Sequence, residues 1–311
     1  MGKKYKRILT AMLCVFFLSL SLHADLIVVD YYNDKAIRMD ETTGSSNVFI
    51  SPASGGLDGP GTVTFGPDGN LYVSSWYNNR ILRYNGQTGQ FMDTFINHGP
   101  STDLWTMAFG PDNNLYVSEW NTARIWKYNG QTGAYMNVFV SSSEGLDSPN
   151  EMQFKDGKLY VVNTYNGTIL RYDAQTGQFI DTFIASVGAS VTSFDFGADG
   201  NIYVGRRGSY KDILKFHGQT GLLMGTFVSS IPGTSDIYDI EFNNDGSMLY
   251  VTTSANQVHR YNGLTGQYID ALSFSGQATY MTFTSVPETQ SLGLVFLSLI
   301  AFLFIRFFHR L

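Results

Sequence analysis

Cysteine is nearly missing from this sequence. The single residue, Cys14, lies inside an apolar run near the N-terminus, so the 311-residue chain has no second thiol for an internal disulfide. Small secreted domains with little core usually depend on disulfides, whereas a chain of this length can bury a large core instead. We therefore expect the stability of the main body to rest on packing alone.

Basic residues are scarce outside the two ends. Of the 20 Lys and Arg residues, four lie in the first seven positions and two in the last six. When these and Glu288 are set aside, 14 basic residues stand against 25 acidic ones between residues 25 and 286, a balance of −11. An acidic body repels phosphate backbones, which argues against nucleic acid as a partner.

Long apolar runs occur only at the two ends. At the N-terminus, a basic start is followed by an apolar run over residues 8–22 and then by Ala24. This is the pattern of a secretory signal peptide cleaved after Ala24, so residues 1–24 predict export. The alternative is an uncleaved N-terminal anchor.

The C-terminal apolar run is a marginal membrane span. Residues 292–305 carry no charge over 14 positions, and as a helix they would be ~21 Å long, short of the ~30 Å hydrocarbon core. Phe307 and Phe308, with Arg306 snorkelling to the interface, bring the segment near the lower limit for spanning. We expect a C-terminal hydrophobic helix over this region.

A short motif precedes that run: Val286, Pro287, Glu288 and Thr289. Motif, apolar helix and basic end together resemble the PEP-CTERM sorting signal of Gram-negative bacteria, although Thr289 stands where a second proline is usual. The resemblance implies that residues 287–311 are a sorting tail read by an exosortase-like membrane enzyme. It also implies export through the inner membrane to the cell envelope or extracellular matrix, and an association with exopolysaccharide. The alternative is a plain C-terminal membrane anchor.

A repeated unit fills the region between the two ends. Aligned on the first residue of an LYV-like segment, the copies start at Leu26, Leu71, Leu115, Leu159, Ile202 and Leu249, with spacings of 45, 44, 44, 43 and 47 residues. The apolar residues alternate with a period of two instead of following the helical spacing. A period in the forties with several short strands predicts propeller blades.

The first copy lacks one strand, and the end of the body supplies it. Each later copy divides into four strands, A to D, with a tight turn such as GPDGN between A and B and NGQTG between C and D. Residues 26–50 contain no A strand, and residues 279–283 read as one. The sequence therefore predicts an all-β, six-bladed β-propeller over residues 25–286, closed by strands from both termini.

The pattern FGPDGNLYVSSWYNNRILRYNGQTGQF at residues 65–91 and its copies carry a family resemblance. They resemble NHL-repeat and related six-bladed propellers over residues 25–285. The Gly-His and Trp-Asp pairs of WD40 blades are absent from the copies. The resemblance supports the predicted blade count.

The loops at the two ends of the ring differ, which suggests where a ligand binds. The A–B and C–D turns are short and uniform, whereas the B–C and D–A connections vary, so we place any site on the B–C and D–A face. Aromatic rings beside carboxylates and amides suit sugars or peptides. The candidate ligand-binding residues are Tyr31, Trp76, Trp105, Trp120, Asp30, Glu119, Asn150, Asn163 and Arg206. The alternative is that these rings only pack between blades.

One basic column repeats in every copy: Arg38, Arg83, Lys127, Arg171, Lys215 and Arg260. A residue repeated around a ring predicts an architectural role, because a binding site on a ring is normally asymmetric. The partners available on strand D are Asp93, Asp181 and Asp270.

Catalytic patterns are weak. In gluconolactonase-like propellers a divalent metal sits over the channel, and Asn150 matches one ligand position of that family. The equivalent residues in the other blades are Gly61, Trp105, Thr192, Tyr238 and Thr279, which do not form a cage for a hard cation. We assign no metal, no cofactor and no catalytic residue.

The histidines give no further support for catalysis. His98, His217 and His259 occupy unrelated positions in their blades, and no nucleophile–base pair is evident. The sequence therefore favours an exported binding or scaffold propeller with a polysaccharide or protein ligand. The alternative is a lactonase- or lyase-type enzyme with a site at the central channel.

Overall fold

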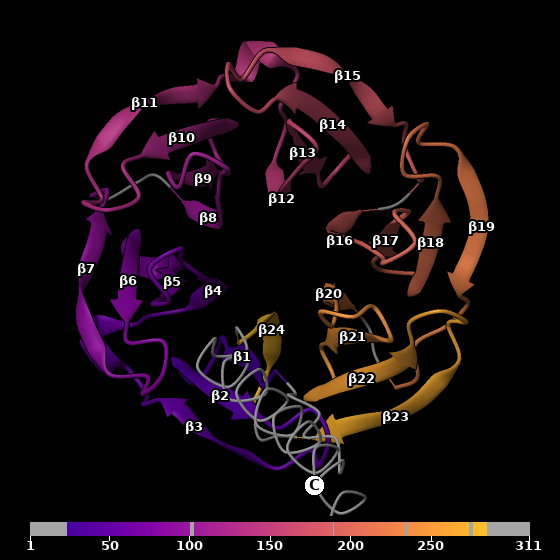
Figure 1. The fold of residues 1–311 in the computed structure, drawn as a ribbon, viewed down its shortest axis with the longest axis horizontal. Coiled ribbons are helices and arrows are strands. Elements are labelled where there is room, and N and C mark those ends of the chain that lie inside the picture. The colour runs from indigo at the N-terminus through magenta and orange to yellow at the C-terminus, as the bar shows by residue number, and fades with distance from the viewer. Residues whose placement is uncertain (1–23, 100–102, 189, 234–235, 274–275, 285–311) are drawn as a thin grey trace, which may run out of the picture. The chain divides into compact units, whose positions relative to one another are not determined.

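The computed structural model describes residues 24–99, 103–188, 190–233, 236–273 and 276–284. Within this part of the chain, 24 strands form six four-stranded antiparallel sheets, and Asp25–Ser285 make one compact unit. The sheets stand as blades around a central opening (Figure 1). The prediction of an all-β, six-bladed propeller is confirmed.

Each blade uses its strands in the order expected from the sequence. The innermost strands, A, are β4 (Pro60–Phe65), β8 (Leu104–Phe109), β12 (Pro149–Lys155), β16 (Val191–Phe196), β20 (Ile237–Phe242) and β24 (Ala278–Phe283). The B strands are β5 (Leu71–Ser75), β9 (Leu115–Glu119), β13 (Lys158–Asn163), β17 (Ile202–Arg206), β21 (Met248–Thr253) and β1 (Leu26–Asp30).

The two outer strands of each blade follow. The C strands are β6 (Arg80–Tyr84), β10 (Arg124–Tyr128), β14 (Thr168–Asp173), β18 (Asp212–Phe216), β22 (Gln257–Asn262) and β2 (Lys35–Met39). The outermost D strands are β7 (Phe91–Asn97), β11 (Tyr135–Val140), β15 (Phe179–Ile184), β19 (Leu223–Val228), β23 (Tyr268–Ser273) and β3 (Ser46–Ile50). Single 3-10 turns occur at η1 (Ser54–Gly56), η2 (Trp76–Asn78) and η3 (Ser142–Glu144).

The core lies between neighbouring blades. Tyr72 of β5 packs edge-on against Phe95 of its own blade and Phe109 of the next, with ring centroids 4.9 and 5.0 Å apart. Tyr116 and Tyr203 likewise lie between a phenylalanine of their own blade and one of the next. Because each tyrosine is buried between two sheets, each blade depends on the next for its core.

The basic column ties the strands of a blade together, as predicted. Arg83 and Arg171 each donate two hydrogen bonds to the aspartate ten positions later on strand D, with nitrogen–oxygen distances of 2.5 to 3.2 Å. Arg260 pairs with Asp270 in the same way. Lys127 and Lys215 instead pair with the A–B turn residues Asp112 and Asp199, both at 2.7 Å.

Strands from both termini close the ring in one sheet, in the order β24-β1-β2-β3. Leu26 pairs with Phe283 and Val28 with Met281. Beyond the strands, the Thr284 N–H donates to the Asp25 carbonyl at 2.8 Å, and the Asp25 N–H donates to the Thr284 hydroxyl at 2.9 Å. The predicted closure is confirmed.

The predicted signal peptide, sorting motif and C-terminal apolar helix lie outside the described residues and stay predictions. Among the residues that the structure describes, no helix is long and apolar enough to cross a membrane.

Candidate binding face and central cavity

Five aromatic rings form a continuous strip on the face of the B–C and D–A connections. Tyr31, Trp76, Trp105, Trp120 and Tyr165 follow one another with centroid distances of 6.1, 5.3, 5.9 and 5.6 Å. We call this set the aromatic strip. Trp105 comes from an A strand, and the other four rings follow B strands in four different blades.

The backbone holds the rings of the strip in place. The N–H of Trp76, at the start of η2, donates to the Gly59 carbonyl at 3.0 Å. The N–H of Trp120 donates to the Asp103 carbonyl at 3.2 Å. These two B–C turns are thereby fixed to the segments leading into their own A strands, which preorganises the backbone that carries the two tryptophans.

Exposed tyrosines lie at both ends of the strip: Tyr165 is its last ring, and Tyr32 and Tyr77 contact Tyr31 at the other end. Tyr165 is 69% exposed, Tyr77 is 60% exposed and Tyr32 is 73% exposed, whereas the three tryptophans are partly buried. The Tyr31 and Tyr77 hydroxyls are hydrogen-bonded at 2.9 Å. The face therefore offers ring surfaces and phenol hydroxyls to solvent.

The polar residues expected beside these rings are buried and make hydrogen bonds within the protein. Asp30, Glu119 and Asn163 are at most 2% exposed. Asp30 accepts from the Asn33 amide and the Gln277 N–H, and Glu119 accepts from the Trp126 indole N–H at 2.9 Å. These side chains hold the loops beneath the strip. They are not displayed next to the rings, because a buried carboxylate or amide must have internal partners.

Asn163 and Arg206 have comparable roles. The Asn163 side chain accepts from the Asp147 N–H at 3.0 Å and donates to the Gly145 carbonyl at 3.1 Å. Arg206 makes two hydrogen bonds to Asp212, at 2.7 and 2.5 Å, and its guanidinium lies 4.0 Å from the centre of the Tyr210 ring. The structure does not bring either residue to the strip.

Asn150 takes part in a bridge across the channel. Its side-chain oxygen accepts from the Tyr280 hydroxyl at 2.8 Å and from the Trp105 indole N–H at 2.9 Å, and the Trp105 N–H also lies 3.1 Å from the Tyr280 oxygen. Asn150 is on β12 and Tyr280 on β24, which lie on opposite sides of the central opening (Figure 1). We call these three residues the bridge. Asn150 therefore has hydrogen-bond partners within the protein. Because Trp105 belongs to both the bridge and the strip, the bridge connects the aromatic strip to the channel.

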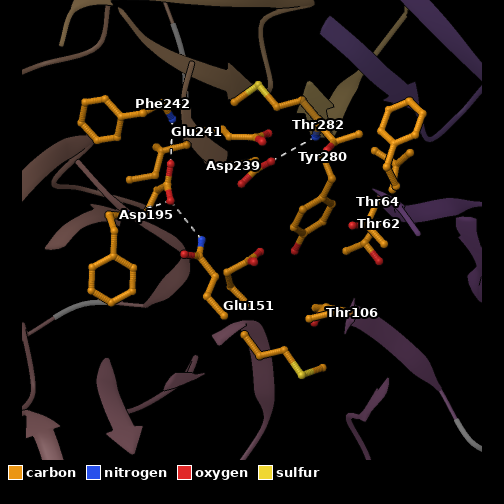
Figure 2. A pocket seen from close by; sticks show the side chains of 18 of the residues that line it. Thr62, Thr64, Thr106, Glu151, Asp195, Asp239, Glu241, Phe242, Tyr280 and Thr282 are labelled. Atoms are coloured by element: carbon orange, nitrogen blue, oxygen red, sulfur yellow. Dashed lines mark hydrogen bonds between the residues drawn. The ribbon is translucent and has the colours of Figure 1, made fainter. Parts of the chain in front are cut away.

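The channel contains a cavity of about 540 Å³ on the side of the A–B turns. Its lining comes from the A strands and from turn residues such as Ala198 and Asn244. Four carboxylates, on Glu151, Asp195, Asp239 and Glu241, point into it together with threonine hydroxyls (Figure 2). No Lys or Arg is among the lining residues.

Burial perturbs these carboxylates strongly. It raises the pKa of Asp195 to about 6 and that of Asp239 to about 7. Burial, and then repulsion from Asp239 and Asp195, raises the pKa of Glu151 and of Glu241 well above the ordinary value. Asp239 accepts from the Ser193 hydroxyl at 2.7 Å and the Met281 N–H at 3.0 Å, which keeps its rise smaller.

The cavity was not predicted from the sequence. Its carboxylates occupy two columns, the positions one and three before the last phenylalanine of each A strand. The first column is Thr64, Ala108, Gln153, Asp195, Glu241 and Thr282, and the second is Thr62, Thr106, Glu151, Ser193, Asp239 and Tyr280. The signal was present, since carboxylates on an innermost strand must face the channel or be buried.

The positions of the possible metal ligands and of the histidines bear on catalysis in the described part of the chain. No group of three or more His, Cys, Asp or Glu residues in the described part has the geometry of a metal site. His98 contacts the Tyr128 hydroxyl and the Trp126 ring, and His259 is buried beside Tyr268. Neither histidine lines the cavity.

Comparisons with known proteins agree on the fold. Residues 86–198 match a family described as a repeat of unknown function (DUF6923). No curated protein matches the chain. A solved structure titled as a nidogen/laminin complex has a TM-score of 0.69 at 14% identity, covering 85% of this chain and 99% of that one.

A second similar structure is a protein of unknown function from Bacteroides caccae. Its TM-score is 0.65 at 12% identity, covering 84% of this chain and 98% of that one. At such identities the likeness shows the propeller fold alone.

Proposed function

We propose that the protein is an exported propeller that binds its partner through the aromatic strip, without catalysis. The observation that carries the proposal is the contact of five rings from different blades, with Tyr165 69% exposed at one end. Partly exposed rings on turns that backbone hydrogen bonds fix in place are typical of preorganised recognition surfaces. We also propose that the protein's repeats are related to those of NHL-repeat propellers.

The binding proposal is tested on glycan and peptide arrays with the wild type, Trp76→Ala and Trp120→Ala. We expect every specific signal of the wild type to fall at least tenfold in both variants, since truncating a tryptophan hot spot costs about 2 kcal/mol or more and about 1.4 kcal/mol is tenfold in affinity. Phe179→Ala is the matched control, because Phe179 is an exposed aromatic on the outer strand β15. Signals unchanged in both tryptophan variants would remove the strip from consideration.

Export and sorting complete the proposal. The basic start, the apolar run and Ala24 support secretion, and the motif from Val286 to Thr289 supports recognition by an exosortase-like enzyme and delivery to the envelope or matrix. The link to exopolysaccharide rests on this tail. Mass spectrometry of the exported protein checks both ends: we expect loss of the first 24 residues and of the segment after about Pro287. An intact Leu311 contradicts sorting.

A second candidate function is a lactonase- or lyase-type enzyme at the channel. The observation in its favour is the cavity, where Glu151 and Glu241 have raised pKa values, as acid–base residues often do. Such an enzyme would turn over some member of a panel of aldonolactones and uronate esters, and Glu151→Gln would abolish the turnover. Equal rates in the wild type and the variant, or no turnover at all, eliminate it.

A further inference from the structure

The chemistry of the aromatic strip narrows the class of ligand, and this step rests on the proposed function. The strip lies across several blades, because Trp76, Trp120 and Tyr165 follow the B strands of three successive blades. Trp105 contacts both Trp76 and Trp120 and so makes the surface continuous. A surface of this shape matches an extended chain better than a compact small molecule.

The charged groups that the structure describes beside the rings include one exposed carboxylate, that of Asp58 near Tyr31. The nearest buried carboxylates, Asp30 and Glu119, are hydrogen-bonded within the protein, and Arg206 is paired with Asp212. Arg207 on the same face is also paired, with Asp236 at 3.3 Å. An anionic ligand would find no unpaired cation among these residues, because Arg206 and Arg207 are both paired, and the body balance of −11 repels a polyanion.

The backbone N–H groups of three ring residues already have partners within the protein. The N–H groups of Tyr31, Trp76 and Trp120 already donate to carbonyls of neighbouring segments, at 3.0 to 3.3 Å. A peptide that binds by adding a strand needs an open edge of paired N–H and C=O groups. Ring faces and phenol hydroxyls remain as the recognition groups at these positions.

From these three observations we infer that the ligand is a chain of neutral sugars lying along the aromatic strip. A pyranose ring presents an apolar CH face to an aromatic ring and hydroxyls at its rim, so it satisfies both kinds of group at once. The ring planes turn by 37° to 89° between neighbours, so the strip offers separate ring faces and edges along which a flexible sugar chain can lie. Tyr165 and Tyr77 are exposed, and their phenol groups are available to hydrogen-bond the sugar rims; the Tyr77 hydroxyl accepts from Tyr31 and can still donate.

The test is affinity electrophoresis of the purified full chain in native gels. The gels contain galactomannan, xyloglucan or a mixed-linkage β-glucan as neutral polymers, or alginate as the anionic one, and a proline-rich decapeptide is assayed in parallel by fluorescence anisotropy. We expect at least one neutral polymer to retard the wild type, with retardation unchanged by 0.5 M NaCl, since no ion pair is involved. Alginate and the peptide are expected to have no effect.

Variants connect the retardation to the strip. Trp76→Ala and Trp120→Ala are expected to weaken it at least tenfold, and Phe179→Ala is expected to leave it unchanged. Because the tryptophans are partly buried, Tyr165→Ala serves as the variant that leaves the core intact; we expect a threefold or greater loss. Melting temperatures of all variants are measured first.

The outcomes separate this inference from the proposed function. Binding of alginate or the peptide alone, abolished in Trp76→Ala, overturns the neutral-sugar assignment and leaves the strip as the binding surface. Retardation by a neutral polymer that none of the strip variants alters overturns the assignment as well. If no probe binds in a way that depends on the strip, both proposals fail.

Discussion

At the scale of the residue, the glycine that ends each C–D turn carries two constraints at once. Gly89 has a φ of +70°, where L side chains are disfavoured, and a Cβ built on it would lie 1.9 Å from the carbonyl oxygen of Phe49 in the neighbouring blade. Gly133 meets the carbonyl of Phe95 in the same way, at 2.1 Å. The GQTG turn therefore repeats because blades touch there, which accounts for its uniformity.

This gives a matched pair of substitutions. Gly69 has a φ of +74° with no atom within 4 Å of its Cβ position, so Gly69→Ala meets only the backbone preference, about 1 kcal/mol. Gly89→Ala adds the inter-blade clash and is expected to cost about 3 kcal/mol in total. Calorimetry should show a Tm loss of roughly 3 °C for the first and two to three times as much for the second. Equal losses would contradict the account.

At the scale of the element, β24 completes the ring. It pairs with β1, and its Met281 N–H donates to Asp239 of the neighbouring blade at 3.0 Å. It also carries Tyr280, which reaches Asn150 on the opposite side of the channel. Without β24, β1 would present an open edge and the bridge would lose one of its three members.

Two truncations isolate this contribution. A chain ending at residue 285 keeps β24, and we expect its Tm to equal that of the full chain because Asp25–Ser285 form one compact unit. A chain ending at residue 276 loses the strand, and we expect its Tm to fall by more than 10 °C, with concentration-dependent light scattering from the open edge. A cooperative melt at the original temperature would show that closure is dispensable.

At the scale of the whole molecule, the channel brings four carboxyl groups with raised pKa values into one cavity. Glu151, Asp195, Asp239 and Glu241 face one cavity from three blades. Burial raises the pKa of Asp195, and the N–H groups of Phe242 and Phe196, together with Gln153 and Lys155, oppose that rise. A carboxyl whose pKa is raised on folding favours the folded state at low pH. The stability that it contributes is lost as the pH rises from the ordinary carboxyl value, about 4, through the folded value, about 6 for Asp195 and 7 for Asp239.

The pH effect is best measured as a difference between variants. Burial lowers the pKa of His98 and His259, so these groups destabilise the fold as the pH falls below about 6.5 and oppose the carboxylates. Glu241→Gln removes one carboxylate only. We expect its Tm to exceed that of the wild type at pH 8 and to converge with it near pH 4.5. A constant difference across this range would show that charge is not responsible.

The fold was largely predictable from the sequence because it is a sum of local signals. Turn residues such as Asp68 and Asn70 recur in register, and Asp68 accepts hydrogen bonds from Asn70 and from the Tyr72 hydroxyl within five positions. The Arg83–Asp93 pair spans only ten positions. Interactions this short are visible as repeated letters, so strand count, closure and the basic column could all be derived.

The site was less predictable because its partners are distant in the chain. Tyr31, Trp76, Trp105 and Trp120 were expected on one face, and their contacts place them there. Whether Asp30 and Glu119 would accompany them depended on the loops beneath, which bury both. A column in the sequence gives a position on a strand, but the partner of each side chain depends on the neighbouring blade.

The sequence by itself determined that this chain is a closed ring of six blades with an acidic body, since period, alternation and turn chemistry act within one repeat. Only the tertiary structure decided what the centre of the ring contains. Tyr280 and Asn150 are 130 positions apart, and Glu151 and Glu241 come from different blades. These residues meet because six innermost strands converge on one axis, and their mutual repulsion and shared burial arise only when the ring closes.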